Sequence, residues 1–142
     1  MAFVQKEFFT RPAHPPIGAA PVSLADAIAA STTGDGRPDQ WYTIGPGIWE
    51  LQLNGDPASD HKAVLQWYEP NTRSVDPVAV ITHTYIEEVC FIQGGLTDVT
   101  LGQGWGPGSY AYRLPGMKHG PYQASSEGCL QFVKLVPVEN QK

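Results

Sequence analysis

From Gly47 onward, short stretches in which apolar and polar residues alternate are separated by turn residues, and this pattern restricts the fold most. Alternation with a period of two is typical of strands that bury one face. The stretches cover residues 49–53, 63–68, 78–85, 89–93, 96–100, 109–113 and 130–136. Gly94-Gly95 is interpreted as a turn, and residues 102–108, which hold four glycines and one proline, as a tight loop. The pattern predicts an all-β sandwich or barrel.

Residues 1–46 lack this alternation and contain many prolines and glycines. One short helix is expected at residues 24–30, because Ser23 can cap its first turn and Asp26 can return a hydrogen bond to the cap. A chain of 142 residues is long enough for one domain with a proper core. We therefore expect an irregular N-terminal arm with one short helix at 1–46 and a single β domain at 47–142.

Charge and hydropathy exclude several classes of partner. The net charge is -5 and no run of Lys or Arg occurs, so the chain offers no surface for nucleic acid. No stretch approaches the roughly 18 apolar residues of a membrane span, and residues 1–22 lack the pattern of a signal peptide. We expect a cytoplasmic protein without membrane contact. Cys90 and Cys129 lie in apolar strand patterns, which favours two buried thiols over a disulfide.

Two segments about thirty residues apart carry a candidate metal site. The first holds His83 and Glu88, and the second holds His119 after a Leu-Pro-Gly turn. Two imidazoles and one carboxylate suit a divalent transition metal with open coordination positions, as in non-heme iron enzymes. Side chains alternate along a strand, so Glu88 shares a face with His83 only if a turn or bulge near Ile86 and Glu87 resets the alternation.

The same residues resemble the two motifs of the cupin superfamily. His83, Glu88 and Gly95 have the spacing of the first motif, and residues 108–119 are similar to the second. The run 106–135 is closest to a branch that contains the cupin domains of anti-sigma factors and dioxygenases acting on acetylacetone or dihydroxyacetophenone. The resemblance implies a double-stranded β-helix (jelly-roll) barrel, metal ligation by His83, Glu88 and His119, and a homodimer. Ile81 stands where the family commonly has a first histidine.

Three residues beside the motifs are candidates for catalysis. Tyr85 shares the face of His83 and could donate a proton, Glu87 could act as a base, and Arg113 could bind an anionic or enolate oxygen. Strand alternation allows only one of Tyr112 and Arg113 to face inward, and the sequence does not choose between them.

Three functions remain open for a small-molecule site of this kind. The first is a non-heme Fe(II) dioxygenase acting on a β-dicarbonyl or a phenolic, polyketide-like substrate. The second is a redox-neutral isomerase, cyclase, dehydratase or decarboxylase in which Zn(II) or another divalent ion acts as a Lewis acid. The third is a ligand or metal sensor without turnover. We expect Fe(II) before Zn(II), and an enzyme before a sensor.

Overall fold

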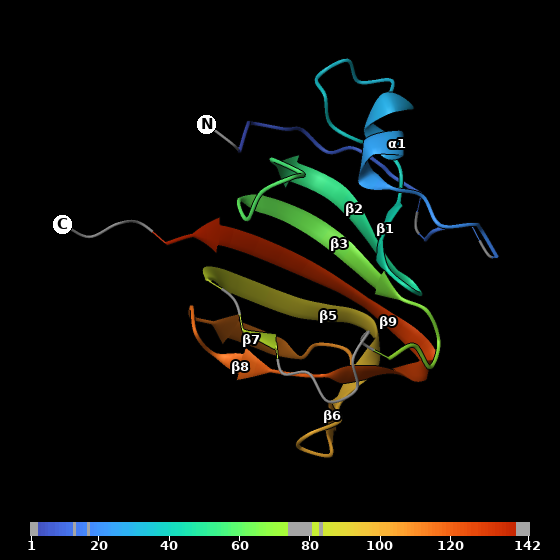
Figure 1. Ribbon diagram of the computed structural model, residues 1–142. Helices are drawn as coiled ribbons and strands as arrows, with labels where there is room; N and C mark the ends of the chain where they lie inside the picture. The colour runs from blue at the N-terminus through green and yellow to red at the C-terminus, as the bar shows by residue number, and fades with distance from the viewer. Residues whose placement is uncertain (1–2, 13, 17, 74–80, 83, 139–142) are drawn as a thin grey trace.

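A computed structural model describes residues 3–12, 14–16, 18–73, 81–82 and 84–138 (Figure 1). This part of the chain forms the helix α1 (Leu24–Ala29) and nine strands. The strands are β1 (Tyr42–Gly45), β2 (Ile48–Gly55), β3 (Lys62–Tyr68), β4 (Ile81–Thr82), β5 (Tyr85–Asp98), β6 (Gln103–Trp105), β7 (Tyr110–Arg113), β8 (Lys118–His119) and β9 (Tyr122–Pro137). The all-β class predicted from the alternation is confirmed.

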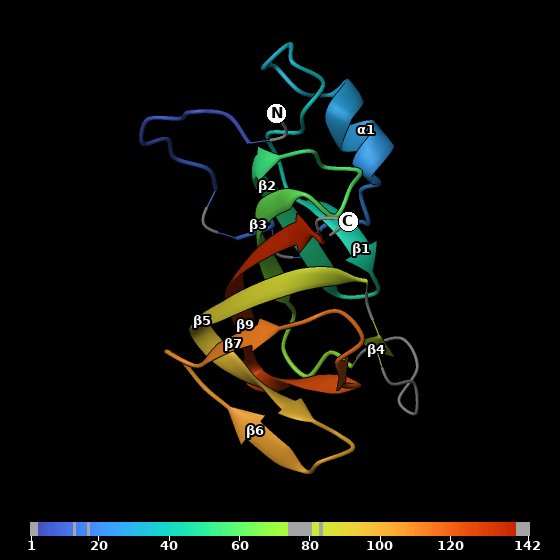
Figure 2. The same ribbon diagram turned by 90° about the vertical axis from the view of Figure 1, so that its left-hand side faces the viewer.

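Seven of these strands form one antiparallel sheet. Its order is β1-β2-β3-β9-β5-β6, with β7 also paired to β5, while β4 and β8 form a separate two-stranded sheet. Figures 1 and 2 show α1 beside the β1–β2 end of the large sheet and β6 and β7 at the opposite end. Within the described residues the strands do not close into a barrel. We call the face of the large sheet that carries Val64, Val89 and Val133 the inner face. The opposite face, which carries Trp49 and Leu51, is the outer face.

The inner face carries an apolar cluster of Val64, Val89, Val133 and Leu135. A second inner cluster consists of Leu96, Tyr122, Ala124 and Cys129, and Phe91 packs against both clusters. Cys129 is fully buried and Cys90 is half-buried, and both are free thiols as predicted.

β5 is one continuous strand of 14 residues, although the sequence predicts two strands with a turn at Gly94-Gly95. That turn prediction is wrong, because the register with β9 shifts twice within residues 91–96 and the strand goes on. A Cβ atom at Gly94 would lie 1.8 Å from the carbonyl oxygen of Gly128, so only glycine lets the two strands approach this closely. The two shifts together form a β-bulge, and the glycine pair lies at the second shift, beside Gly128. The predicted loop at 102–108 likewise contains the short strand β6.

The bulge changes which residues of β5 face inward. Before it, inward residues have odd numbers, as Val89 shows; after it they have even numbers, as Leu96 shows. The first shift, between Phe91 and Gln93, adds one residue to β5 and produces this reset. The inward face of β5 is therefore continuous in space although its numbering changes parity.

The outer face of β2 and β3 is covered by the N-terminal segment. Trp41, Trp49 and Leu51 form a buried cluster against which Ala19 and Val22 pack. In α1, Ser23 Oγ accepts a hydrogen bond from the Asp26 amide at 3.1 Å, which confirms the predicted cap. No helix in the described part of the chain is long and apolar enough to cross a membrane. β1 lies within residues 1–46, so the chain joins the sheet before the boundary expected at residue 47.

Candidate functional site

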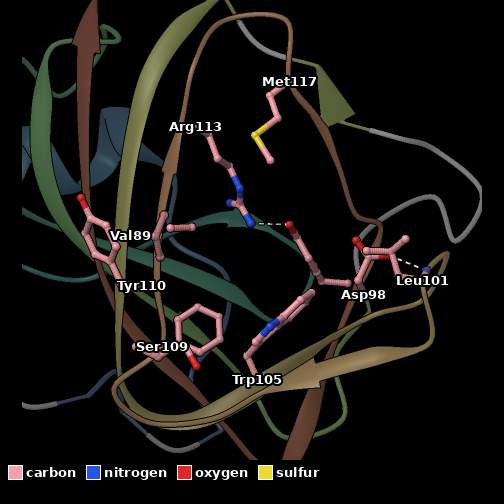
Figure 3. A pocket seen from close by; sticks show the side chains of 11 residues that line it. Val89, Asp98, Leu101, Trp105, Ser109, Tyr110, Arg113 and Met117 are labelled. Carbon is pink, nitrogen blue, oxygen red and sulfur yellow. Dashed lines mark hydrogen bonds between the residues drawn. The ribbon is translucent and has the colours of Figure 1, made fainter.

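A cavity of about 270 Å³ opens on the inner face, between β5, β7 and the loops at residues 99–102 and 114–117 (Figure 3). Most of its wall is apolar. The apolar lining residues are Val89, Phe91, Leu101, Trp105, Ala111 and Met117. A concave, mostly apolar cavity with a few polar groups is the usual form of a small-molecule site.

Arg113 supplies the positive charge of this cavity. Its side chain is 16% exposed, and its Nη1 donates to Glu87 Oε1 at 2.7 Å. Its Nη2 donates to the Tyr122 hydroxyl oxygen at 2.6 Å, and the guanidinium lies 5.6 Å from the Tyr122 ring centroid. Figure 3 shows Arg113 reaching into the cavity. Tyr112 is 53% exposed on the outer face, so Arg113 is the residue of this pair that faces inward.

Tyr122 lines the same cavity and was not found by the sequence analysis. Burial raises the pKa of its hydroxyl to about 12, the Arg113 charge lowers the pKa, and Asp98 and Glu87 raise it further. The hydroxyl therefore stays protonated at neutral pH. No motif signals Tyr122, because it is brought to the cavity by the pairing of β9 with β5 beyond the bulge.

Asp98 lines the opposite wall of the cavity in Figure 3 and is 5% exposed. Its Oδ1 accepts a hydrogen bond from the Leu101 amide at 2.9 Å, and its Oδ2 accepts one from the Gly120 amide at 3.2 Å. Two backbone donors stabilise the buried carboxylate. Asp98 was missed because its inward position depends on the register shift between Phe91 and Gln93, which comes from pairing with the distant strand β9.

Glu87 and Glu88 lie on opposite faces of β5. The register is unbroken from Tyr85 to Phe91, so the bulge that the sequence analysis assumed near Glu87 does not occur there. Glu87 faces inward to Arg113, whereas Glu88 Oε2 accepts a hydrogen bond from the Tyr110 hydroxyl at 2.5 Å. Tyr110 is 61% exposed, and Figure 3 shows its hydroxyl directed away from Arg113.

Tyr85 lies on the inner face with Glu87 but is not among the residues that line the cavity. It packs against the cluster around Val89. Burial raises the pKa of its hydroxyl, and the Glu87 charge adds to that rise. The structure thus brings Glu87 and Arg113 into contact and leaves Tyr85 beside them, where its role as a proton donor stays a prediction.

The predicted metal ligands are described only in part. His83 lies outside the described residues, and His119 is described by its backbone, which pairs with Ile81 across β4 and β8. Among the described residues, no group of three His, Cys, Asp or Glu side chains could hold a metal ion. With Glu88 on the outer face, the described side chains do not assemble the predicted donor set, and ligation by His83, Glu88 and His119 stays a prediction.

A second polar group on the inner face surrounds Glu50, which is 2% exposed. Its carboxylate accepts hydrogen bonds from the Tyr42 hydroxyl at 2.5 Å, Lys62 Nζ at 2.9 Å and Gln66 Nε2 at 3.3 Å. Burial and the Glu50 charge raise the pKa of Tyr42. This group is saturated with hydrogen bonds and lies away from the cavity lining, which is the pattern of a structural ion pair.

The described chain is similar to several solved structures. An RmlC-like cupin from Shewanella frigidimarina has 17% identity and a TM-score of 0.54 over 71% of this chain and 86% of that chain. The polyketide cyclase RemF from Streptomyces resistomycificus has 20% identity and a TM-score of 0.50, over 70% and 73% of the two chains. The complex of SigE with the anti-sigma ChrR from Rhodobacter sphaeroides has 22% identity and a TM-score of 0.51, over 66% and 46%.

These likenesses show the fold. The chain has the cupin fold, which confirms the fold implied by its two motifs. No protein-family model and no curated protein matches the sequence.

Proposed function

We propose that this protein is an enzyme that binds a small oxygenated compound, a β-dicarbonyl or a phenolic ketone, in the cavity beside Arg113. The observation that carries the proposal is a nearly buried guanidinium, held by Glu87 and Tyr122, in a cavity whose wall is mostly apolar. A fixed cation in such a site stabilises negative charge that develops on a carbonyl oxygen.

The described residues support redox-neutral carbonyl chemistry. Arg113 would hold the oxygen of an enolate, while Asp98, the carboxylate among the described lining residues, would accept the proton that leaves the adjacent carbon. The electron pair of that C–H bond moves into the enolate, and return of the proton to another carbon completes an isomerisation. Glu87 acts as a positioning residue, because it fixes Arg113 and does not line the cavity.

The cupin fold is compatible with the proposed enzyme. RemF, one of the solved structures with this fold, is a polyketide cyclase. Trp105 and Phe91 give the cavity two aromatic walls, which would suit a planar substrate with a ring.

A metal-dependent dioxygenase is the second candidate. The pairing of β4 with β8 favours it, because His119 lies directly across from Ile81, the position where the first cupin motif commonly has a histidine. The two motif segments are therefore adjacent in space. Fe(II), or Zn(II) in a redox-neutral variant, would be the ion. Such an ion would supply Lewis-acid or oxygen chemistry when bound.

The test of the proposal is a substrate screen with β-dicarbonyls and hydroxyaryl ketones, followed by NMR in air and under argon. For a compound that is converted, Arg113→Met should lower kcat/KM by about 10² to 10³, the usual effect of removing one group that stabilises an oxyanion. Arg113→Lys should lose less. Arg73→Met is the matched control, because Arg73 is exposed, donates to Gln123 and does not line the cavity. Unchanged turnover in Arg113→Met would refute the proposal.

Elemental analysis separates the two candidates. Turnover under argon by metal-free protein would support the redox-neutral reaction at Arg113 and Asp98. About one iron per chain, lost in His83→Ala and His119→Ala, together with consumption of dioxygen, would support the second candidate instead. Tight binding of a compound without turnover in any condition would indicate a sensor.

A further inference from the structure

A second cavity lies between the outer face of the large sheet and the N-terminal segment. Its volume is about 800 Å³, which is in the usual range of small-molecule sites. Figure 2 shows the N-terminal segment beside β1, β2 and β3 and away from β7, which borders the cavity that holds Arg113. No described residue lines both cavities. We call the second one the outer cavity.

The floor of the outer cavity is a row of three side chains on neighbouring strands. Trp67 of β3 lies directly across from Leu130 of β9, and Leu130 lies directly across from Gln93 of β5. Residues paired in this way point to the same face of a sheet. Trp67 and Leu130 also pack against the buried cluster that contains Trp49. The folded sheet therefore supplies this floor before any ligand binds.

The opposite wall comes from the N-terminal segment, which is attached to the sheet on both sides of the cavity. Before the wall, the Pro12 carbonyl oxygen accepts a hydrogen bond from Trp41 Nε1 at 3.0 Å. Within the wall, Pro15 is buried, and the Ala19 amide donates to the Pro16 carbonyl oxygen at 3.2 Å. Ala19 also packs against the cluster of the outer face. These contacts hold the wall in place over the floor.

The polar groups of the outer cavity include several acceptors and one full negative charge. Glu69 Oε1 accepts a hydrogen bond from Trp49 Nε1 at 3.0 Å, whereas no donor among the described residues reaches Glu69 Oε2. His14 Nδ1 lies 2.9 Å from the Pro15 carbonyl oxygen, to which it can only donate, so Nε2 of the neutral ring is an acceptor. Gln93 adds an amide oxygen, and none of the described lining residues is Lys or Arg. This set of groups favours a positively charged ligand.

We propose that the outer cavity binds a small organic cation, an ammonium group carried on an apolar body with a ring. The ammonium group donates to Glu69 Oε2 and interacts with the indole ring of Trp67, as cations do with aromatic side chains. The apolar body lies between Leu130 and Pro16. The net charge of -5 adds a long-range attraction for a cation. This site does not involve Arg113 and does not depend on the proposed function.

The experiment is an NMR titration of the full chain with phenethylamine, tryptamine and 4-phenylbutylamine, observed on the indole N–H signals. The Trp67 signal is assigned by its absence in Trp67→Phe. At least one amine should shift this signal with a Kd of about 1 mM or below, as expected for a ligand of this size. The alcohols of the same carbon skeletons are the neutral controls and should bind at least about 10-fold more weakly, because they lack the charge.

A charge variant tests the role of Glu69. Glu69→Gln removes the charge and keeps an oxygen that can accept from Trp49, so it should raise the Kd of the amine about 5-fold. Glu127→Gln is the matched control, because Glu127 is exposed and does not line the outer cavity, and it should leave the Kd unchanged. Circular dichroism checks that each variant keeps its fold. The proposal would be overturned by a Trp67 signal that none of the amines shifts, by equal affinity for amine and alcohol, or by an unchanged Kd in Glu69→Gln.

Discussion

The two faces of the large sheet place the same residue type in different surroundings. Two adjacent glutamates show this difference in burial and partners most clearly. Glu87 points inward and forms an ion pair with Arg113 at 2.7 Å, with 13% of its side chain exposed. Glu88, one residue later, points outward and accepts a hydrogen bond from the exposed Tyr110. A shift of one residue along a strand exchanges the two faces. Register therefore decides which acid contacts Arg113 and which lies on the surface.

The bulge at residues 91–96 extends the inner face beyond the point where simple alternation would end it. With it, Asp98 joins Val89 and Phe91 in the cavity wall although its number has the other parity. Without it, Asp98 would face outward. The distinction between the faces thus depends on one local irregularity as much as on alternation.

The strongest way to break the distinction is to force β5 and β9 apart next to the bulge. Gly94→Ala places a Cβ 1.8 Å from the Gly128 carbonyl oxygen at a φ of +65°, so β5 and β9 must separate. We expect a loss of more than about 4 kcal/mol in the free energy of unfolding, or no folding at all. Gly102→Ala is the control, because its φ is +67° but nothing lies within 4 Å of the added atom, and it should cost only about 1 kcal/mol. Urea denaturation measures both, and equal losses would contradict the steric explanation.

The adjacent glutamates offer a second, smaller test. Glu87→Gln removes the counter-charge of the nearly buried Arg113 guanidinium and should lower the free energy of unfolding by about 3 kcal/mol. Glu88→Gln removes a charge from the outer face and should change it by no more than about 0.5 kcal/mol. The measurement is urea denaturation of both variants under the same conditions. Similar losses in the two variants would show that removing a glutamate charge costs the same free energy of unfolding on either face.

The smallest expected effect is a change in the free energy of unfolding with pH, which comes from buried groups of the inner face. Burial raises the pKa of the Cys129 thiol from 9.0 to about 12, and the Tyr122 pKa also rises to about 12. The unfolded chain releases these protons at lower pH than the folded chain, so stability is full below about pH 9 and falls as pH rises toward 12. For the thiol alone the loss between pH 9 and pH 10 is about 1 kcal/mol. Cys129→Ala should flatten this part of the stability curve, and an unchanged slope would contradict a buried thiol.

Several elements were predictable from the sequence because their signals are local. The alternation in 49–53 and 63–68 predicted β2 and β3, and Ser23 predicted the start of α1. The two motifs predicted the cupin fold. Arg113 was identified as a candidate, although alternation alone could not choose between it and Tyr112.

The remaining errors have one physical origin. A glycine pair has the same composition in a turn and in a bulge, and only the approach of Gly128 from a distant strand separates the two cases. Asp98, which lies beyond the bulge, was not identified as a candidate for the same reason. Metal ligation by Glu88 also required a reset near Glu87, whereas the reset occurs farther along β5. Local patterns place strands, but pairing between distant strands decides which face they present.

The position of β9 has a consequence for how the chain acquires its structure during synthesis. β9 lies between β3 and β5, although it follows both in the sequence, and residues 62–68 pair with residues 129–135. Until β9 leaves the ribosome, β3 and β5 each have an unpaired edge that can associate with other chains. The large sheet must then assemble in one late step that joins distant segments, which predicts slow folding and a need for protection of the nascent chain.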